Sequence, residues 1–196
     1  MIRVFLDTEF SGLVVDPKLI SIGLVSEGGQ TFYAELADTY SQEDVSDFAR
    51  MAVLPHLEGG TALMTMRELG ERLAAWLTAF GAPVKLATDS RAWDWPWVQE
   101  IFYELGTWPE NLDGKPLLLT VNCLNDMDRF NDAVEKAFAS GLRRHHALDD
   151  AKANRLGWFA AGGDIDRVVQ FDGELHPVDN QSEPFGRTAI TERLSS

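Results

Sequence analysis

Cysteine, long apolar runs and positive charge are all scarce in this sequence. Cys123 is the only cysteine among 196 residues, which excludes a disulfide framework within the chain and a zinc site built from cysteines. No apolar run reaches the roughly 18 residues that a membrane-spanning helix needs. The start, MIRVFLDTEF, lacks the basic region, long apolar region and small-residue cleavage site of a signal peptide. We therefore expect a protein that works in a reducing, cytoplasmic setting, without contact with a membrane.

The acidic residues strongly outnumber the basic ones. Lys and Arg number 17 and Asp and Glu number 31, which gives a formal net charge of -14. This balance argues against a protein that grips a long nucleic acid through many phosphate contacts. It allows an enzyme that holds a short chain end, because metal ions bound by several acids supply local positive charge.

The chain has the length and composition of one globular domain with a substantial core. Hydrophobic periodicity and Gly/Pro punctuation predict three early strands, then alternating helices and strands. This order predicts an α/β fold, a mixed five-stranded sheet with helices on both faces. We expect one domain over residues 1–162 and a C-terminal extension, 163–196, that packs on the domain or on a partner chain. The predicted strands are 3–7, 19–26, 31–36, 84–88 and 116–121. The predicted helices are 44–54, 66–80, 95–105, 127–140 and 147–159.

Two acids lie in the first predicted strand. Asp7 and Glu9 stand two residues apart in VFLDTEF. Residues i and i+2 of a strand point to the same face, with Cα atoms roughly 7 Å apart. Carboxylates that close repel each other, and a shared divalent cation relieves the repulsion. The alternative is a solvated strand face that carries two acids. The apolar neighbours from Val4 to Phe10 favour a site at a strand end.

A third acid stands in the middle of the chain. Asp94 lies in SRAWDWPWVQEIF, before an apolar helical pattern. Asp is a preferred N-cap and Pro is tolerated in a first turn, so an N-cap role is one interpretation and a functional carboxylate is the other. The flanking tryptophans, Trp93, Trp95 and Trp97, are more typical of a core or an interface than of base stacking.

The last acidic cluster is HHALDDA, residues 145–151. Two histidines, His145 and His146, lead into a predicted helix whose first turn carries Asp149 and Asp150. Acids in a first turn suit the helix dipole, which is the structural interpretation. On a helical wheel Asp150 lies opposite the apolar stripe, so it faces either solvent or a site.

The order of these clusters resembles the DEDDh family of 3′-5′ exonucleases, which have a ribonuclease H-like fold. FLDTEF matches the first motif with Asp7 and Glu9, SRAWDWPWV matches the second with Asp94, and the H-x-A-L-x-D pattern in HHALDDA places His145 and Asp150. The DTEF start, ISIG and DWPWV are most similar to the small actinobacterial-type exoribonucleases. The resemblance covers roughly residues 1–159. The chain lacks the usual Thr-Gly after the first motif and the Asn and Phe before the second Asp.

The resemblance implies a phosphodiester hydrolase with a two-metal mechanism. Asp7, Glu9, Asp94 and Asp150 would bind two Mg²⁺ or Mn²⁺ ions, which prefer oxygen ligands. His145 would take a proton from the attacking water. The expected activity releases 5′-mononucleotides from the 3′ end of short or single-stranded RNA. His146 and Asp149 remain rivals of their neighbours for these roles.

The resemblance also implies where substrate binds. Phe10, Ser11 and Leu13 would lie beside the terminal nucleotide, where an aromatic ring can stack on any base. Phe10 as a core residue is the alternative. Arg143 belongs to a basic group that could meet phosphates or simply form a charged helix face. The other members of that group are Arg144, Lys152 and Arg155.

Three questions stay open at the level of sequence. The motifs do not separate RNA from DNA, so a 3′-5′ DNA exonuclease is an alternative, because contacts to the 2′-OH are not legible. A non-catalytic member that binds a nucleotide or a protein partner is the other alternative. Six tryptophans and the resemblance to dimeric ribonuclease T-like enzymes predict a homodimer.

Overall fold

The computed structural model describes residues 1–122 and 126–163, which belong to a compact unit that spans Met1–Asp166. Apart from Gly163, the predicted extension 163–196 lies outside the described residues, as does Cys123. The domain boundary and the packing of the extension therefore stay predictions. Within the described ranges, no helix combines the length and the apolar character needed to cross a bilayer.

Strands and helices alternate after an all-β start, as the periodicity predicted. The strands are β1 (Ile2–Phe10), β2 (Leu19–Ser26), β3 (Thr31–Leu36), β4 (Leu63–Met64), β5 (Val84–Thr88) and β6 (Leu117–Leu118). The α-helices are α1 (Asp47–Ala52), α2 (Met66–Thr78), α3 (Arg91–Leu105), α4 (Leu119–Asn122), α5 (Met127–Ala139) and α6 (Ala147–Ala160). Two 3₁₀ turns are η1 (Leu54–His56) and η2 (Gly60–Ala62).

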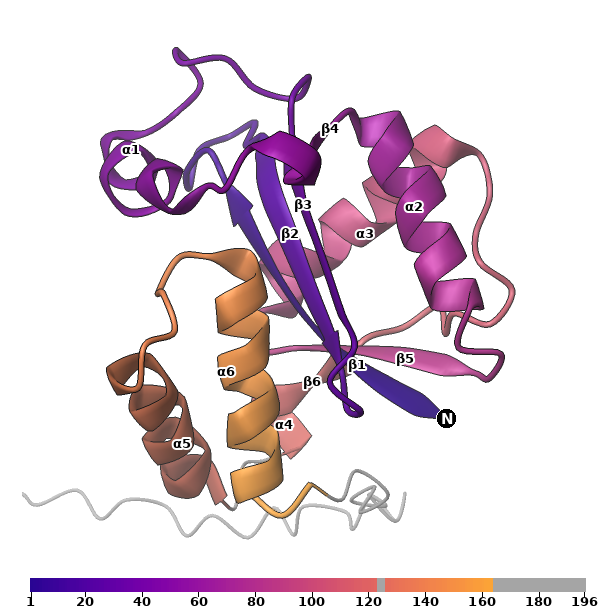
Figure 1. Ribbon diagram of the computed structural model, residues 1–196, viewed down its shortest axis with the longest axis vertical. Coiled ribbons are helices and arrows are strands. Elements are labelled where there is room, and N and C mark those ends of the chain that lie inside the picture. The colour runs from indigo at the N-terminus through magenta and orange to yellow at the C-terminus, as the bar shows by residue number, and fades with distance from the viewer. Residues whose placement is uncertain (123–125, 164–196) are drawn as a thin grey trace, which may run out of the picture. The chain divides into compact units, whose positions relative to one another are not determined.

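The strands form one mixed sheet in the order β4-β3-β2-β1-β5-β6. β1, β2 and β3 form an antiparallel meander, whereas β5 runs parallel to β1 and β6 parallel to β5. α5 and α6 lie on one side of the sheet and α2 and α3 on the other (Figure 1). The predicted α/β class, with a mixed sheet and helices on both faces, is confirmed.

The alternation of side chains along β1 divides the core between the two faces. Val4 and Leu6 belong to the cluster that includes α2 and α3, and Phe5 packs with Phe130 and Trp158 on the α5–α6 side. Since strand side chains alternate, the odd residues that follow Phe5 also face α6. The core packing thus places the next two acids of β1 on the α6 side of the sheet.

The strand count and the bounds of several elements differ from the prediction. β1 runs to Phe10, three residues past its predicted end, α1 is shorter than the predicted helix 44–54, and α3 begins at Arg91, four residues before its predicted start. The sheet has a sixth strand, β4, which pairs with β3 in parallel over two residues and is too short to show a period. The predicted strand 116–121 is a strand only at Leu117–Leu118, and the chain then turns into α4. A short apolar run fits a buried strand and a buried helical turn equally well, so periodicity alone misassigned it.

Candidate active site

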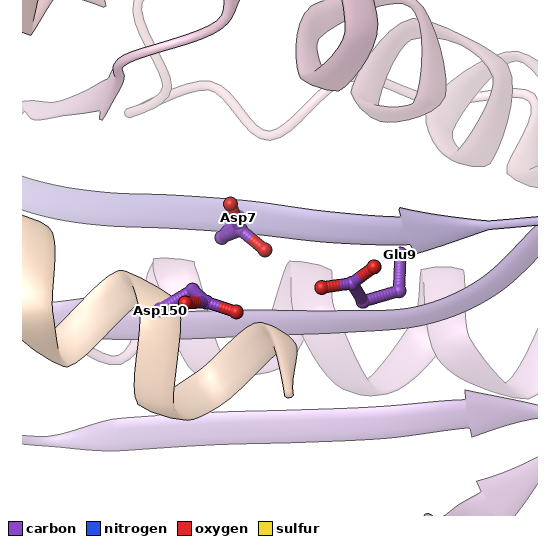
Figure 2. A group of neighbouring side chains, drawn as sticks. All are labelled: Asp7, Glu9 and Asp150. Carbon is purple, nitrogen blue, oxygen red and sulfur yellow. The ribbon is translucent and has the colours of Figure 1, made fainter. Parts of the chain in front are cut away.

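Three carboxylates from two elements meet above the sheet. Asp7 and Glu9 project from β1 and Asp150 projects from the first turn of α6, and Figure 2 shows the three side chains gathered around a common space. One oxygen of each lies within 4.8 Å of the others. The period of the strand brings two of these acids together, and the packing of α6 on the sheet adds the third.

A glycine allows α6 to approach this closely. Gly23 pairs with Asp7 across β1 and β2. A Cβ atom built at Gly23 would lie 2.1 Å from the backbone nitrogen of Leu148, in the first turn of α6. Any side chain here would push the helix away, because protein interiors are close-packed. The glycine of the ISIG segment therefore makes room for the helical turn that carries Asp150.

The fourth predicted acid reaches the site from α3. That helix begins at Arg91 with Ser90 as its N-cap, so Asp94 lies within the first turn and is not the N-cap. Asp94 is buried, and its Oδ1 accepts hydrogen bonds from the backbone nitrogen of Thr8 at 3.1 Å and from Thr8 Oγ1 at 2.6 Å. The Thr88 hydroxyl donates to Oδ2. These bonds fix the carboxylate at the ends of β1 and β5.

A fifth carboxylate joins the cluster, which sequence reasoning missed. Asp89 follows β5 directly, and one of its oxygens lies within 4.8 Å of oxygens of Asp7 and Asp94. The signal was present in the sequence, since an acid directly after a parallel strand lies at the same sheet edge as the end of its neighbour. Two overlapping groups of three acids thus share Asp7.

Burial and mutual repulsion make these acids hard to ionise in the metal-free protein. Desolvation is the largest cause for each: it raises the pKa of Glu9 to about 8 and those of Asp94 and Asp150 to about 7, and holds the pKa of Asp7 well above its usual value. Neighbouring carboxylates add to the shift. A divalent cation would displace the shared protons, so this all-oxygen group fits Mg²⁺ or Mn²⁺.

The two adjacent histidines point in different directions. His145 has a positive φ of 60° and a half-exposed side chain, and its Nδ1 lies 3.8 Å from Glu9 Oε1. The side chain of His146 is fully buried, and its ring stacks on Tyr33 with centroids 4.5 Å apart. Only His145 faces the carboxylates, which is the geometry that the H-x-A-L-x-D register predicts.

The two adjacent aspartates also separate. Asp149 lies outside the carboxylate group and accepts hydrogen bonds from Arg143 at 2.7 Å and Lys152 at 3.0 Å. Burial opposes its ionisation, but these bonds prevail and lower the pKa of Asp149 to about 2. Asp149 is thus an ion-pair residue, whereas Asp150 belongs to the carboxylate cluster.

A pocket of about 330 Å³ opens over the cluster, which is within the size range of small-molecule sites. Phe10 lies in its wall and stacks on Trp93 with centroids 5.4 Å apart, while also packing against the core. Phe10 is thus a partly buried residue at the edge of the core, and its stacking on a terminal nucleotide stays a prediction. The lining residues are Asp7, Thr8, Glu9, Phe10, Asp89, Ser90, Trp93, Asp94, Val134, Phe138, Arg144, His145, Asp150 and Asn154.

Three predicted substrate-binding residues lie outside this wall. The Ser11 side chain is buried, and its hydroxyl accepts from the backbone nitrogen of Lys18 at 2.9 Å. Leu13 is 74% exposed on the loop that follows β1. Arg143 is engaged by Asp149, and its neighbour Arg144 faces the pocket instead. The substrate contacts of Ser11, Leu13 and Arg143 stay predictions.

Comparison of the whole structure with solved structures identifies a nuclease fold. The chain superposes on the nuclease domain of 3'hExo, a DEDDh family member bound to rAMP, with a TM-score of 0.57. The match covers 84% of this chain and 94% of that domain at 16% identity. The fold is that of a DEDDh nuclease domain.

The likeness to the DEDDh nuclease domain is structural. No family model and no curated protein matches the sequence. At 16% identity the comparison shows the DEDDh fold, and the function of this chain must be argued from its own residues. The site described above lies where β1, β5, α3 and α6 of that fold meet.

Proposed function

We propose that this chain is a metal-dependent 3′-5′ exoribonuclease that releases 5′-mononucleotides from short or single-stranded RNA. One observation carries the proposal: the acids from three separate motifs and one histidine gather in a single pocket. The DEDDh nuclease fold supports it. The pocket has a volume of about 330 Å³, and we infer that it holds a single chain end. The net charge of -14 likewise argues against a protein that grips a long strand.

The carboxylates are the groups that would hold the metal ions. Asp7, Glu9 and Asp150 form one ligand set, and Asp94 with Asp7 lies beside a second position. Two bound Mg²⁺ or Mn²⁺ ions would stabilise the charge on the attacking and leaving oxygens of a phosphodiester. Thr8 and Thr88 hold the Asp94 carboxylate in place by hydrogen bonds, so the chain keeps this ligand oriented before a substrate arrives.

His145 is the proposed general base. Partial burial and the nearby Arg144 charge lower the pKa of His145 below its usual value, so the imidazole is neutral near pH 7 and accepts a proton. Its position at the edge of the acid cluster, 3.8 Å from Glu9, suits proton removal from a water held between the acids and the substrate phosphate.

RNA is the proposed substrate, a cytoplasmic setting the proposed location and a homodimer the proposed assembly. The structural neighbour is bound to rAMP, which favours a ribonucleotide end. Phe10 stacked on Trp93 offers an aromatic edge to a terminal base. The dimer rests on the resemblance to ribonuclease T-like enzymes, and a light-scattering mass of one chain would refute it.

The deciding experiment uses a 5′-labelled single-stranded RNA and its DNA counterpart, each with Mg²⁺, Mn²⁺ or chelator. We expect a ladder that shortens from the 3′ end, requires metal and is absent in Asp7→Ala. Asp16→Ala is the matched control, because the Asp16 side chain is 82% exposed and its ion-pair partner among the described residues is Lys18. Faster cleavage of DNA would favour the DNA exonuclease. Metal binding without cleavage of either strand would favour a non-catalytic nucleotide-binding protein.

A further inference from the structure

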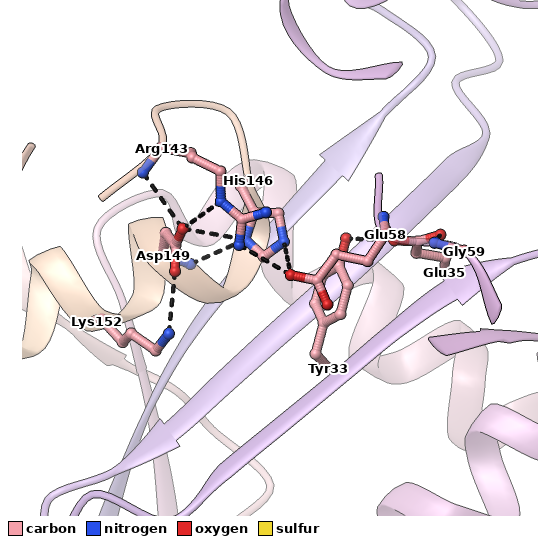
Figure 3. A network of polar contacts seen from close by, with 8 residues as sticks. All are labelled: Tyr33, Glu35, Glu58, Gly59, Arg143, His146, Asp149 and Lys152. Atoms are coloured by element: carbon pink, nitrogen blue, oxygen red, sulfur yellow. Dashed lines mark hydrogen bonds and ion pairs between the residues drawn. The ribbon is translucent and has the colours of Figure 1, made fainter. Parts of the chain in front are cut away.

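The residues on both sides of His145 are tied to one glutamate. Glu58 lies on the loop between η1 and η2, and its Oε1 lies 2.9 Å from Arg143 Nη2 and 3.3 Å from His146 Nε2 (Figure 3). Arg143 also bonds Asp149 in α6. A single carboxylate from a distant loop thus contacts the second residue before His145 and the first residue after it.

The hydrogen bond of His146 Nδ1 determines which ring nitrogen carries the proton and faces Glu58. Its Nδ1 accepts a hydrogen bond from the backbone nitrogen of Asp149 at 3.3 Å and so caps α6. Burial lowers the pKa of His146, so the ring is neutral and carries its proton on Nε2. That buried Nε2 makes no hydrogen bond within the part of the chain that the structure describes, and Glu58 Oε1 is the carboxylate oxygen 3.3 Å from it.

The loop that carries Glu58 is itself anchored to the sheet. Glu35, a buried residue of β3, accepts hydrogen bonds from the backbone nitrogens of Glu58 at 2.5 Å and Gly59 at 2.9 Å. The Tyr33 hydroxyl donates to the same carboxylate at 2.9 Å, and the Tyr33 ring stacks on His146. The contact between Glu58 and the histidine turn therefore rests on β3.

His145 needs such support because its backbone is in an unfavourable conformation. It is the only described non-glycine residue with a positive φ, 60°, and a residue in this strained region persists only where its surroundings impose the conformation. The ring is contacted edge-on by Phe48 of α1, with centroids 5.0 Å apart. The ties on Arg143 and His146 hold the turn between them in this conformation.

We propose that Glu58 is a positioning residue, which holds His145 at the carboxylate cluster through Arg143 and His146. The inference rests on the proposed function, in which His145 is the general base. Glu58 does not line the pocket, so its effect on chemistry passes through the histidine turn. A displacement of about 1 Å in a catalytic group can lower a rate 100-fold.

The position of Glu58 allows this role to be separated from folding. Its side chain is 49% exposed, and an exposed ion pair contributes little to stability. Glu58 belongs neither to the acid cluster nor to any of the apolar clusters of the core, so its removal leaves them intact. The expected phenotype is a slow enzyme that is folded and binds metal.

The test compares Glu58→Ala and Glu58→Gln with the parent. We expect kcat to fall at least tenfold in Glu58→Ala, with KM and calorimetric Mn²⁺ affinity within twofold. Glu58→Gln, which keeps an acceptor for the His146 Nε2–H but loses the charge that binds Arg143, should be intermediate. Glu71→Gln is the matched control, since Glu71 pairs with Arg67 on the exposed face of α2. It should leave kcat unchanged.

An NMR measurement tests the positioning role of Glu58 without relying on nuclease activity. Long-range ¹H–¹⁵N spectra of the imidazoles should show the Nε2–H form of His146 in the parent, and shifted or broadened His145 and His146 signals in Glu58→Ala. Unchanged kcat and signals in Glu58→Ala would overturn the proposal. So would a loss of kcat that is matched by equal losses of Mn²⁺ affinity and melting temperature. A parent without nuclease activity would remove the proposed function, and the NMR spectra would still decide whether Glu58 positions His145.

Discussion

Asparagine at position 150 should stabilise the metal-free protein. Burial raises the pKa of Asp150 from 3.8 to about 7, so ionisation of this carboxyl opposes folding. Below about pH 4 the group is protonated in both states and contributes nothing. As the pH rises, the Asp150 carboxyl ionises first in the unfolded chain. The free energy of unfolding therefore falls until the pH passes about 7, where the carboxyl is ionised in the folded state as well. Asp150→Asn removes a titrating group whose effect on stability is unfavourable throughout this window.

The structure sets the size of the effect. A pKa difference of about 3 units, at about 1.4 kcal/mol each, costs about 4 kcal/mol at pH 8. The backbone around His145 and His146 hydrogen-bonds the carboxylate, and weaker acceptance by the amide offsets about 1 kcal/mol. The net gain of about 3 kcal/mol corresponds to a rise of about 6–12 °C in Tm for a chain of this size. At pH 5.5 the gross effect falls to about 2 kcal/mol.

Thermal unfolding in chelator at pH 8 and pH 5.5 measures this prediction, and the adjacent residue is its control. Asp149→Asn should lower the Tm at pH 8, because the ionised Asp149 carboxylate binds Arg143 and Lys152. Solvent screening limits that loss to about 1–2 kcal/mol. Saturating Mn²⁺ should reduce or reverse the difference in Tm between Asp150→Asn and its parent, because only the parent keeps all the proposed metal ligands. A metal-free Asp150→Asn protein that melts below its parent at pH 8 would refute the reasoning.

Three further outcomes follow from the site and its packing. His145→Ala should lower kcat by about 10²–10⁴-fold, and His146→Ala by less; the reverse ranking in a single-turnover assay would shift the register by one residue. Asp89→Asn should weaken Mn²⁺ binding about tenfold in calorimetry, because Asp89 lies within 4.8 Å of two cluster acids; an unchanged Kd would remove it from the metal site. Gly23→Ala should cost at least about 3 kcal/mol in urea unfolding, since its Cβ would lie 2.1 Å from the Leu148 nitrogen; an unchanged midpoint would show that α6 moves freely.

Local patterns predicted the elements well where a period was long enough to read. β2, β3 and β5 have the predicted bounds, and α2, α5 and α6 differ from prediction by no more than two residues at an end. The failures were short or ambiguous segments. α3 begins four residues earlier than predicted, because Pro96 was interpreted as part of a first turn and instead lies inside the helix. Two-residue strands such as β4 carry no periodic signal at all.

Some features of the site were already determined by the sequence. The spacing of Asp7 and Glu9 in a strand places them on one face whatever else the chain does, because strand side chains alternate. The resemblance to the H-x-A-L-x-D pattern favoured His145 and Asp150, but His146 and Asp149 stayed rivals until the structure showed which side chains face the carboxylate cluster. The pairing of Asp7 and Glu9 is a consequence of local backbone geometry, whereas the preference for His145 and Asp150 is what the family resemblance implied.

Convergence of the site was decided only by tertiary structure. Gly23 lets α6 approach β2, and Thr8 and Thr88 fix Asp94 at the ends of two strands. Asp89 joins the cluster because β5 ends beside β1. Arg143 does not line the pocket, because Asp149 and Glu58 bind its guanidinium. Side chains far apart in sequence meet only through the packing of whole elements, and no local pattern carries that information.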